Sequence, residues 1–219
     1  MRSLYALALL SLAVSGGAAC DRAKASLGTA AAAPAEGSST SLTESTPPTA
    51  RAALEPRDDL PGLPNFAKVS DVLYRGAQPT AEGFRTLKNM GVKTVVSLRM
   101  LHSDRKMLEG TGLQYRRISA KAWHPEDEDV ARVLKIVEDP KNQPVFVHCE
   151  HGADRTGTVV AAYRMVEQGW TNEEAAAELQ AFGYHPIWAE ILTYLSRFER
   201  KAMQQTVANT PAPSLDLIE

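Results

Sequence analysis

Apolar and polar positions follow two rhythms along the middle of the chain. Short, nearly continuous apolar runs such as Val145 to Val147 are typical of buried strands, whereas apolar residues that recur every three or four positions are typical of amphipathic helices. Pro125 to Glu138 shows the helical rhythm clearly, with proline in the first turn, where no hydrogen bond is lost. Its apolar face holds Val130, Val133, Leu134 and Val137.

The strands and helices predicted in this way alternate. We expect strands at Val72 to Arg75, Lys93 to Leu98, Leu113 to Ser119 and Val145 to Val147. We expect helices at Thr80 to Asn89, Ser103 to Glu109, Pro125 to Glu138, Thr156 to Gln168, Thr171 to Ala181 and Pro186 to Lys201. The alternation predicts an α/β fold, with a mostly parallel central sheet of about four or five strands flanked by helices. Ligands of such sheets bind beyond the carboxyl ends of the strands.

Residues 1–20 have the layout of a secretory signal peptide, with an early positive charge at Arg2, an apolar core from Leu4 to Val14 and small residues after it. The segment is too short to span a membrane. Its end, Gly17 to Cys20, resembles a bacterial lipoprotein signal, in which the cysteine is lipidated and becomes the mature N-terminus; simple cleavage is the alternative. We therefore expect an exported bacterial protein, periplasmic or anchored to a membrane surface through Cys20.

Segments of biased composition border the central part. Residues 21–62 are rich in Ala, Ser, Thr, Pro and Gly and poor in large apolar side chains, so they bury too little surface to offset the entropy of ordering. Residues 204–219 have a similar composition. We expect a disordered linker and a disordered tail on either side of one domain, residues 63–203, which suits a chain of 219 residues.

Charge and cysteine content narrow the function classes. The formal net charge of −2 leaves no basic footprint for nucleic acid. If Cys20 is lipidated, Cys149 is the only free thiol of the mature protein and has no partner for a disulfide. A lone thiol in an oxidising compartment favours catalysis over packing. A monomeric chain is expected.

The segment VFVHCEHGADRTG, Val145 to Gly157, joins a strand to a helix through a short loop. The backbone N–H groups of such a loop and the dipole of the following helix hold an oxyanion of phosphate size, and they also stabilise a thiolate. Cys149 is therefore the candidate nucleophile, and the planar fork of Arg155 is the candidate phosphate ligand. Gly152 permits backbone angles and close approaches that a side chain would obstruct.

The motif HCEHGADRTG resembles the HCxxGxxR(S/T)G signature of the cysteine-dependent protein tyrosine and dual-specificity phosphatases, and every fixed position is matched. The resemblance extends upstream through VLYRGAQP, residues 72–79, and VKTVVSLR, residues 92–99, and covers about residues 63–202 in the layout of compact atypical dual-specificity phosphatases. It implies a phosphotyrosine-phosphatase-like three-layer fold, a phosphocysteine intermediate, and no metal or other cofactor.

The general acid, which protonates the leaving group, is left open by the motif. The resemblance places an Asp on the loop before a helix, here residues 120–129, where Asp127 is best placed; acidic residues in a first helical turn are also expected from the dipole alone. Asp154, in a GxDRTG pattern shared with some bacterial relatives, is preferred as the acid or as the group that orients water. His124, or no acid at all, is the remaining alternative.

The residues around the nucleophile have expected supporting and substrate-binding roles. His148 is expected to hydrogen-bond backbone near Cys149, and the hydroxyl of Thr156 to donate to the leaving sulfur. For Arg99, which ends a strand at the same edge, an ion pair with an acid is the alternative to substrate binding. The expected substrate-binding residues are Glu150, His151, Gly152, Ala153, Thr156, Gly157 and Arg99.

The variable positions of the loop narrow the class of substrate that we expect. These positions, which add no fixed positive charge, are Glu150, His151, Ala153 and Asp154. By resemblance, relatives that act on phosphoinositides or inositol phosphates tend to have basic residues there. We therefore expect phosphotyrosine in a phosphoprotein, with phosphoserine and phosphothreonine as further substrates, and a small inositol phosphate or a phosphoinositide as the alternative. A non-catalytic phosphate-binding module and a rhodanese-type sulfurtransferase fit the motif less well.

Overall fold

A computed structural model of the chain describes residues 54–218. The predicted signal peptide, Cys20 and the predicted linker up to residue 53 lie outside these residues. Within residues 54–218, no helix has both the length and the apolar character needed to cross a membrane.

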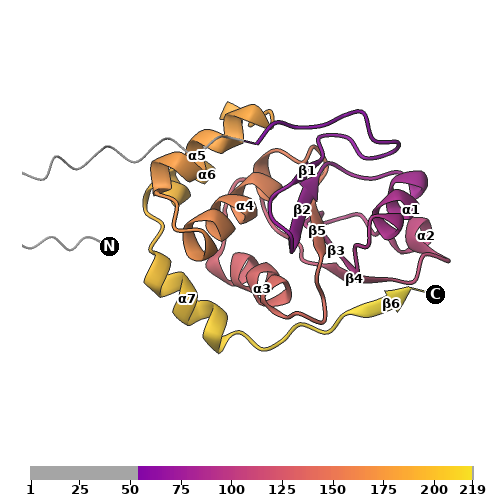
Figure 1. Cartoon of the computed structure of the whole chain (residues 1–219). Coiled ribbons are helices and arrows are strands. Elements are labelled where there is room, and N and C mark those ends of the chain that lie inside the picture. Colours follow the sequence, from indigo (N-terminus) through magenta and orange to yellow (C-terminus); the bar gives the residue numbers. More distant parts are fainter. Residues whose placement is uncertain (1–53, 219) are drawn as a thin grey trace, which may run out of the picture. The chain divides into compact units, whose positions relative to one another are not determined.

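A six-stranded sheet forms the centre of the fold (Figure 1). Its four central strands, in the order β2-β5-β3-β4, run parallel, and β1 and β6 pair antiparallel at the two edges. The prediction of a mostly parallel sheet is confirmed, and the two short edge strands are additions to it. The strands are β1 (Ala67–Lys68), β2 (Leu73–Gly76), β3 (Thr94–Ser97), β4 (Leu113–Arg117), β5 (Val145–His148) and β6 (Asp216–Ile218).

Helices cover both faces of the sheet, which confirms the three-layer α/β fold. In Figure 1, α1 and α2 lie on one side of the sheet, and α3, α4, α5, α6 and α7 lie on the other. Side chains alternate along β5, so that Val145 and Val147 pack into the core under the larger group of helices and Phe146 packs under the smaller one. The helices are α1 (Ala81–Asn89), α2 (Arg105–Leu108), α3 (Asp127–Glu138), α4 (Asp154–Glu167), α5 (Asn172–Ala181), the 3-10 turn η1 (Pro186–Trp188), α6 (Ala189–Ser196) and α7 (Arg200–Asn209).

Strand β5 lies at the centre of the sheet and ends at the candidate loop. His148, its last residue, pairs with Gly76 at the end of β2 and with Ser97 at the end of β3. All four residues of β5 are buried, as expected of a parallel strand covered on both faces. Cys149 therefore lies at the carboxyl edge of the sheet, where ligands of this fold class bind.

The prediction of a disordered tail at residues 204–219 is wrong for the described part, which ends at residue 218. Helix α7 continues to Asn209, and β6 then pairs with β4. Met203 and Val207 are both buried in the core, and their spacing of four places them on one helical face. The polar residues between these two apolar positions hid this face from a reading based on composition.

Two further boundaries differ from the prediction. Residues 54–62, assigned to the linker, belong to the domain, since the backbones of Arg57 and Phe66 exchange hydrogen bonds of 2.7 and 2.9 Å and Leu60 packs against the core. The single helix predicted at Pro186 to Lys201 is divided into η1, α6 and α7. The helix is interrupted near Phe198, whose side chain is buried. The Phe198 carbonyl, which has no helical partner at this interruption, accepts a hydrogen bond of 3.1 Å from Asn172 Nδ2.

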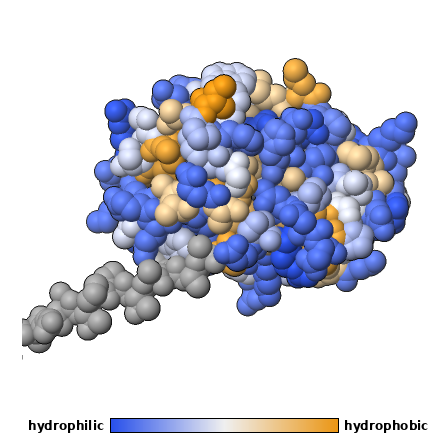
Figure 2. Space-filling model, turned by 90° about the horizontal axis from the view of Figure 1, so that it is seen from above, coloured by the Kyte–Doolittle hydropathy of each residue, from blue (hydrophilic) through white to orange (hydrophobic). Residues whose placement is uncertain are grey.

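The surface of the domain is mainly polar on the face shown in Figure 2, where apolar residues form small separate groups. Among the described residues, the large apolar side chains with the greatest exposure are Leu101, Ile187, Leu217 and Trp123. Single exposed apolar residues of this kind are ordinary on protein surfaces, so they give no separate indication of function.

Candidate active site

The backbone carbonyls of the candidate loop are all engaged by donors from the surrounding structure. The loop joins β5 to α4, and each carbonyl from Cys149 to Ala153 accepts a hydrogen bond. The pairs are His148 Nδ1 with Cys149 O (3.1 Å), Gln78 N with Glu150 O (3.1 Å), Asn65 Nδ2 with His151 O (2.8 Å), Arg75 Nη2 with Gly152 O (2.8 Å) and Gly157 N with Ala153 O (2.7 Å).

The N–H groups of the same loop are left available. A trans peptide is planar, so its C=O and the following N–H point in opposite directions. Within residues 54–218, no acceptor takes the N–H of Glu150, His151, Gly152 or Ala153. Because the carbonyls face the surrounding protein, these donors face the opposite side, where the N-terminus of α4 adds its partial positive charge. The arrangement is a cradle for an oxyanion.

The three residues with expected chemical roles lie at the two ends of this cradle. Cys149 is a free cysteine and is only 1% exposed. Arg155 is half-buried, and its Nη1 donates to the Leu98 carbonyl at 3.3 Å, while its Nε has no partner among the described residues. The hydroxyl of Thr156 is buried and likewise has no partner there. Both side chains thus retain donors for a bound group.

Gly152 permits the loop to pack directly on the end of β2. Its φ is +71°, in the region that favours glycine, and a Cβ atom there would lie 2.5 Å from the carbonyl carbon of Gly76 and 2.6 Å from the nitrogen of Ala77. The backbone of the loop and the backbone of the strand therefore touch. This contact fixes the distance between the cradle and the sheet.

Arg75 is a functional residue that the sequence reading did not single out. It is 0% exposed in the middle of β2, donates to the Gly152 carbonyl and lies 3.5 Å over the centre of the Phe182 ring. Burial lowers the pKa of the Arg75 guanidinium to about 10, against the opposing effect of nearby Glu178 and Cys149. The side chain is a cation at neutral pH, and it supports the cradle by binding the carbonyl side of the loop. The sequence signal that could have identified Arg75 is the presence of a charged residue inside an otherwise apolar parallel strand.

His148 forms a buried pair with Asp104. The Nε2 of His148 lies 3.1 Å from Asp104 Oδ2, while its Nδ1 faces the carbonyl of Cys149. Both partners are acceptors, so each ring nitrogen faces a group that can take a hydrogen bond from it. The predicted contact with backbone beside the nucleophile is present, and the carboxylate partner is new.

Asp104 extends this pair into a network that reaches the edge of the cradle. Burial alone would raise the pKa of Asp104, but hydrogen bonds from His148 and Gln78 outweigh it, and the pKa lies below its ordinary value. Gln78 Nε2 donates to Asp104 at 2.8 Å, and Gln78 Oε1 accepts from Arg99 Nη1 at 2.8 Å. Arg99 Nη2 also lies 3.7 Å from Glu150. The ion pair considered for Arg99 is thus formed in the structure.

A cavity of about 200 Å³ opens beside the loop. Arg155, Arg99 and Glu150 line it together with residues 100–102. The fold therefore brings the expected loop residues and Arg99 to one place. Its lining carries charges of both signs.

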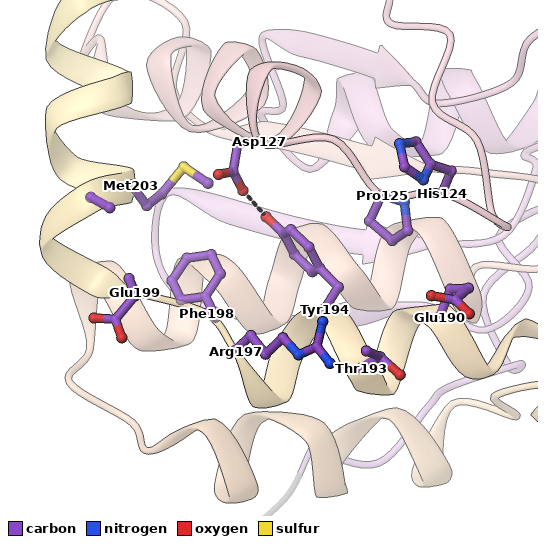
Figure 3. Close-up of a pocket in the computed structure, with 11 residues that line it drawn as sticks. His124, Pro125, Asp127, Glu190, Thr193, Tyr194, Arg197, Phe198, Glu199 and Met203 are labelled. Atoms are coloured by element: carbon purple, nitrogen blue, oxygen red, sulfur yellow. Dashed lines mark hydrogen bonds between the residues drawn. The ribbon is translucent and has the colours of Figure 1, made fainter. Parts of the chain in front are cut away.

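Asp127, one of the two candidate acids, lines a different pocket from the cavity beside the loop (Figure 3). It begins α3, and its Oδ1 accepts a hydrogen bond of 2.7 Å from the hydroxyl of Tyr194 on α6. The two side chains point toward one another across an open pocket of about 410 Å³, which His124 also lines. Burial, and then the hydrogen bond to Asp127, raise the pKa of Tyr194. Neither Asp127 nor His124 lines the cavity at Arg155.

Asp154, the other candidate, is turned toward a different loop. It is 5% exposed, and its two oxygens accept from the backbone N–H of His185 at 2.9 Å and from His185 Nδ1 at 2.8 Å. The rings of His185 and His151 are 5.2 Å apart. His185 is distant in the sequence from His151 and Asp154, and contact between the start of α4 and the turn after α5 brings the three side chains together.

The described residues match one family of known proteins. Residues 61–189 match the family described as DSP-PTPase phosphatase fused to NAD+ Kinase. The dual specificity protein phosphatase TpbA of Pseudomonas aeruginosa is 36% identical over 121 residues, which are 55% of this chain and 55% of that protein. The inositol diphosphatase DSP2 of Oryza sativa subsp. japonica is 25% identical over 66% of this chain and 74% of its own length. The chain thus spans about half the length of the TpbA sequence it matches.

Solved structures show the same fold. The crystal structure of P. aeruginosa TpbA matches with a TM-score of 0.63 and 31% sequence identity. The matched part is 73% of this chain and 98% of the TpbA chain in that structure. A structure of a TpbA variant in complex with pTyr has the same TM-score at 30% identity, over 73% of this chain and 99% of the other.

Replacement of Asp104 by Asn should destabilise the domain in a pH-dependent way. The variant leaves the buried His148 with one weaker partner, so we expect a loss of about 3 kcal/mol near pH 6. The folded pKa of Asp104 is lowered, so its contribution is complete above the ordinary value of 3.8 and is lost as the pH falls through the lower folded value. Urea unfolding of both proteins between pH 6 and pH 3 should show the difference shrinking on acidification. The exposed control Asp71→Asn should change stability by less than about 0.5 kcal/mol, and an equal loss at every pH for Asp104→Asn would contradict the expectation.

Replacement of Arg75 by Met should weaken anion binding more than it weakens the fold. The variant removes the cation and the donor to Gly152, while an apolar side chain fills the buried space. We expect the dissociation constant for inorganic phosphate, measured by calorimetry, to rise about tenfold, which corresponds to the loss of one hydrogen bond of about 1.4 kcal/mol. Arg75→Lys, which keeps the charge, should lose less affinity. Unchanged phosphate affinity in Arg75→Met would remove the supporting role.

Proposed function

We propose that this chain, which belongs to the family described as DSP-PTPase phosphatase fused to NAD+ Kinase, hydrolyses phosphate monoesters through a phosphocysteine intermediate. The observation that carries the proposal is the polarity of the loop after β5. Between Cys149 and Arg155 its carbonyls accept hydrogen bonds, and among residues 54–218 no acceptor takes the N–H groups of residues 150–153. A cradle of that polarity fits a tetrahedral oxyanion next to a sulfur nucleophile.

The residues present supply both halves of the reaction. The thiolate of Cys149 attacks phosphorus, an S–P bond forms, and the P–O bond to the leaving group breaks as that oxygen takes a proton. Water then attacks the phosphocysteine, the S–P bond breaks, and the thiolate returns. Arg155 binds two phosphate oxygens with its fork in both steps, and the Thr156 hydroxyl donates to the departing sulfur. The loop and Arg155 neutralise the phosphate, so the scheme uses no metal.

Phosphotyrosine in a phosphoprotein is the proposed main substrate, with phosphoserine and phosphothreonine beside it. TpbA is named a dual specificity protein phosphatase, and the structure of its complex contains pTyr. Three basic side chains outside the loop have carboxylate partners in this chain, which favours a substrate with a single phosphate. The pairs are Arg99 with Glu150, Lys121 with Glu126 and Arg105 with Asp216.

An inositol phosphate is the second candidate substrate. Relatives named inositol diphosphatases from Oryza sativa and Arabidopsis thaliana support it. Such a substrate carries several phosphates in a small volume and needs unpaired cations around the cradle. A panel of phosphotyrosine, phosphoserine and phosphothreonine peptides, phosphoinositides and inositol phosphates, tested on one preparation, ranks the two candidates by kcat/KM.

Substitution of Cys149 by Ser tests the reaction itself. We expect the isolated domain to hydrolyse p-nitrophenyl phosphate in EDTA and to be inhibited by vanadate. Cys149→Ser should abolish turnover because the hydroxyl is a far weaker nucleophile, while the circular dichroism spectrum and unfolding midpoint stay unchanged. Arg155→Lys should lower kcat by about 100-fold or more, since it loses the bidentate contact. Turnover that survives in Cys149→Ser, or that requires an added divalent cation, would rule out this mechanism.

We also propose that the protein is exported from a bacterial cell and anchored to a membrane surface through a lipid on Cys20, as a monomer. The support is the signal-like sequence of residues 1–20. In a bacterial host, wild-type protein should sediment with membranes and incorporate labelled fatty acid, and Cys20→Ala should do neither. Equal partitioning of the two proteins would favour simple cleavage.

A further inference from the structure

The described structure brings neither of the expected carboxylates to the cradle as a free acid. Asp127 is bound by Tyr194 in the pocket of Figure 3, and Asp154 has both oxygens occupied by His185. Glu150, at the rim, lies near Arg99, and Glu126 accepts a hydrogen bond from Lys121 at 2.6 Å. Expulsion of a tyrosine oxygen, whose conjugate acid has a pKa of about 10, still requires a proton donor.

His185 has the geometry of a proton-transfer group. Its Nδ1 faces the Asp154 carboxylate, which can only accept, so this nitrogen carries a proton in either charge state of the ring. The second nitrogen, Nε2, has no partner among residues 54–218, and 46% of the side chain is exposed. The contact with Asp154 thus fixes both the tautomer and the orientation of the ring, while the other nitrogen is free to gain and lose a proton.

The turn that carries His185 is joined to the phosphate loop at three points. Asn65 Nδ2 donates both to the carbonyl of His151 in the loop and to the carbonyl of Phe182 in the turn, at 2.8 and 3.0 Å. Asp154 binds the backbone N–H of His185 as well as its ring. The ring of His185 also lies beside the ring of His151, 5.2 Å from centre to centre. These contacts hold the turn of His185 against the phosphate loop and place the ring beside that of His151.

We propose that His185, oriented by Asp154, is the proton-transfer residue of the reaction, acting on the leaving oxygen and then on water. This inference rests on the proposed phosphatase function. In the first step the His185 Nε2–H gives its proton to the leaving oxygen as the P–O bond breaks and the S–P bond forms. In the second step the neutral Nε2 takes a proton from the attacking water as the S–P bond breaks. The ring ends in its initial state, and the products are an alcohol and phosphate.

Asp154 acts through His185 and is therefore a positioning residue. Its carboxylate balances the positive charge of the protonated ring, which is the form that the first step needs. The other titratable groups beside His185 are His151 and Tyr184, and burial, followed by the charge of Asp154, raises the pKa of Tyr184. His151 is a second imidazole at the rim, so variants of His185 need a comparison with His151.

Two substitutions of His185 separate proton transfer from a purely structural role. In His185→Asn, the amide N–H can still donate to Asp154, so the contact between the two loops remains while the titratable nitrogen is lost. His185→Ala loses both. For a phosphotyrosine peptide we expect kcat to fall about 100-fold in both variants. For p-nitrophenyl phosphate, whose leaving group departs readily as an anion, we expect the release of p-nitrophenol in the first turnover, measured by rapid mixing, to fall less than about fivefold. Hydrolysis of the phosphocysteine is common to both substrates and should be slowed for both.

The pH dependence of kcat gives a second readout. With the phosphotyrosine peptide, the wild-type rate should decline on the alkaline side as the ring loses its proton, and His185→Asn should lack this decline. Asp154→Asn should lower kcat on the phosphotyrosine peptide, because the ring loses the carboxylate that orients it. The control variant Asp71→Asn, at an exposed carboxylate paired with Lys68, should retain the wild-type profile and the wild-type ratio between the two substrates, and His151→Gln is measured beside it.

The outcomes distinguish this inference from the proposed function. If His185→Asn has wild-type rates on both substrates while His185→Ala is impaired, or if the first-turnover release of the tyrosine peptide and of p-nitrophenol is slowed equally, His185 is structural and the inference fails. If His151→Gln instead shows the selective loss on phosphotyrosine, the inference also fails. The proposed function fails separately, when wild-type protein hydrolyses neither substrate or Cys149→Ser remains active.

Discussion

The cradle depends on a loop whose carbonyls accept hydrogen bonds, while the N–H groups of residues 150–153 have no acceptor within the described part of the chain. An N–H group shielded from water without an acceptor costs about 1–3 kcal/mol, so such a loop tends to rearrange toward any available carbonyl unless it is held from outside. Here the holding contacts come from Gln78, Asn65 and Arg75, which bind the carbonyls of Glu150, His151 and Gly152. Each contact uses the outward side of a peptide, so holding the loop also orients its donors.

The same requirement explains why charged side chains lie in the core beneath the loop. Apolar residues of similar volume would stabilise this region at least as well as a buried ion pair does. They would not, however, bind carbonyls. Arg75 and the pair of His148 with Asp104 do so, and each has a compensating partner, since Arg75 lies over the Phe182 ring and Asp104 accepts from Gln78 as well. Burying these charges costs free energy, and the contacts that they make with the carbonyls keep the loop in the shape of the cradle.

The parts of the structure that were predicted from the sequence are those set by local signals. The strand, loop and helix around Cys149 follow one another directly, and apolar spacing identified the central strands and most of the helices. What was missed depends on distant contacts: β6 forms only by pairing with β4, and α7 is stable because Met203 and Val207 reach the core. Arg75 was quoted as part of a motif, but its role becomes visible only when β2 is placed beside the loop.

The two candidate acids show most clearly why local sequence signals could not decide between them. Asp127 and Asp154 are each the first residue of a helix, so the helix dipole favours both equally and cannot tell them apart. Tertiary contacts separate them: α6 brings a tyrosine hydroxyl to Asp127, while the turn after α5 brings both the backbone and the ring of His185 to Asp154. A carboxylate that is saturated by donors is poorly suited to release a proton itself, but it is well suited to hold a ring that does. Proton transfer is therefore assigned to His185, which lies 31 positions after Asp154, and not to the aspartate inside the motif.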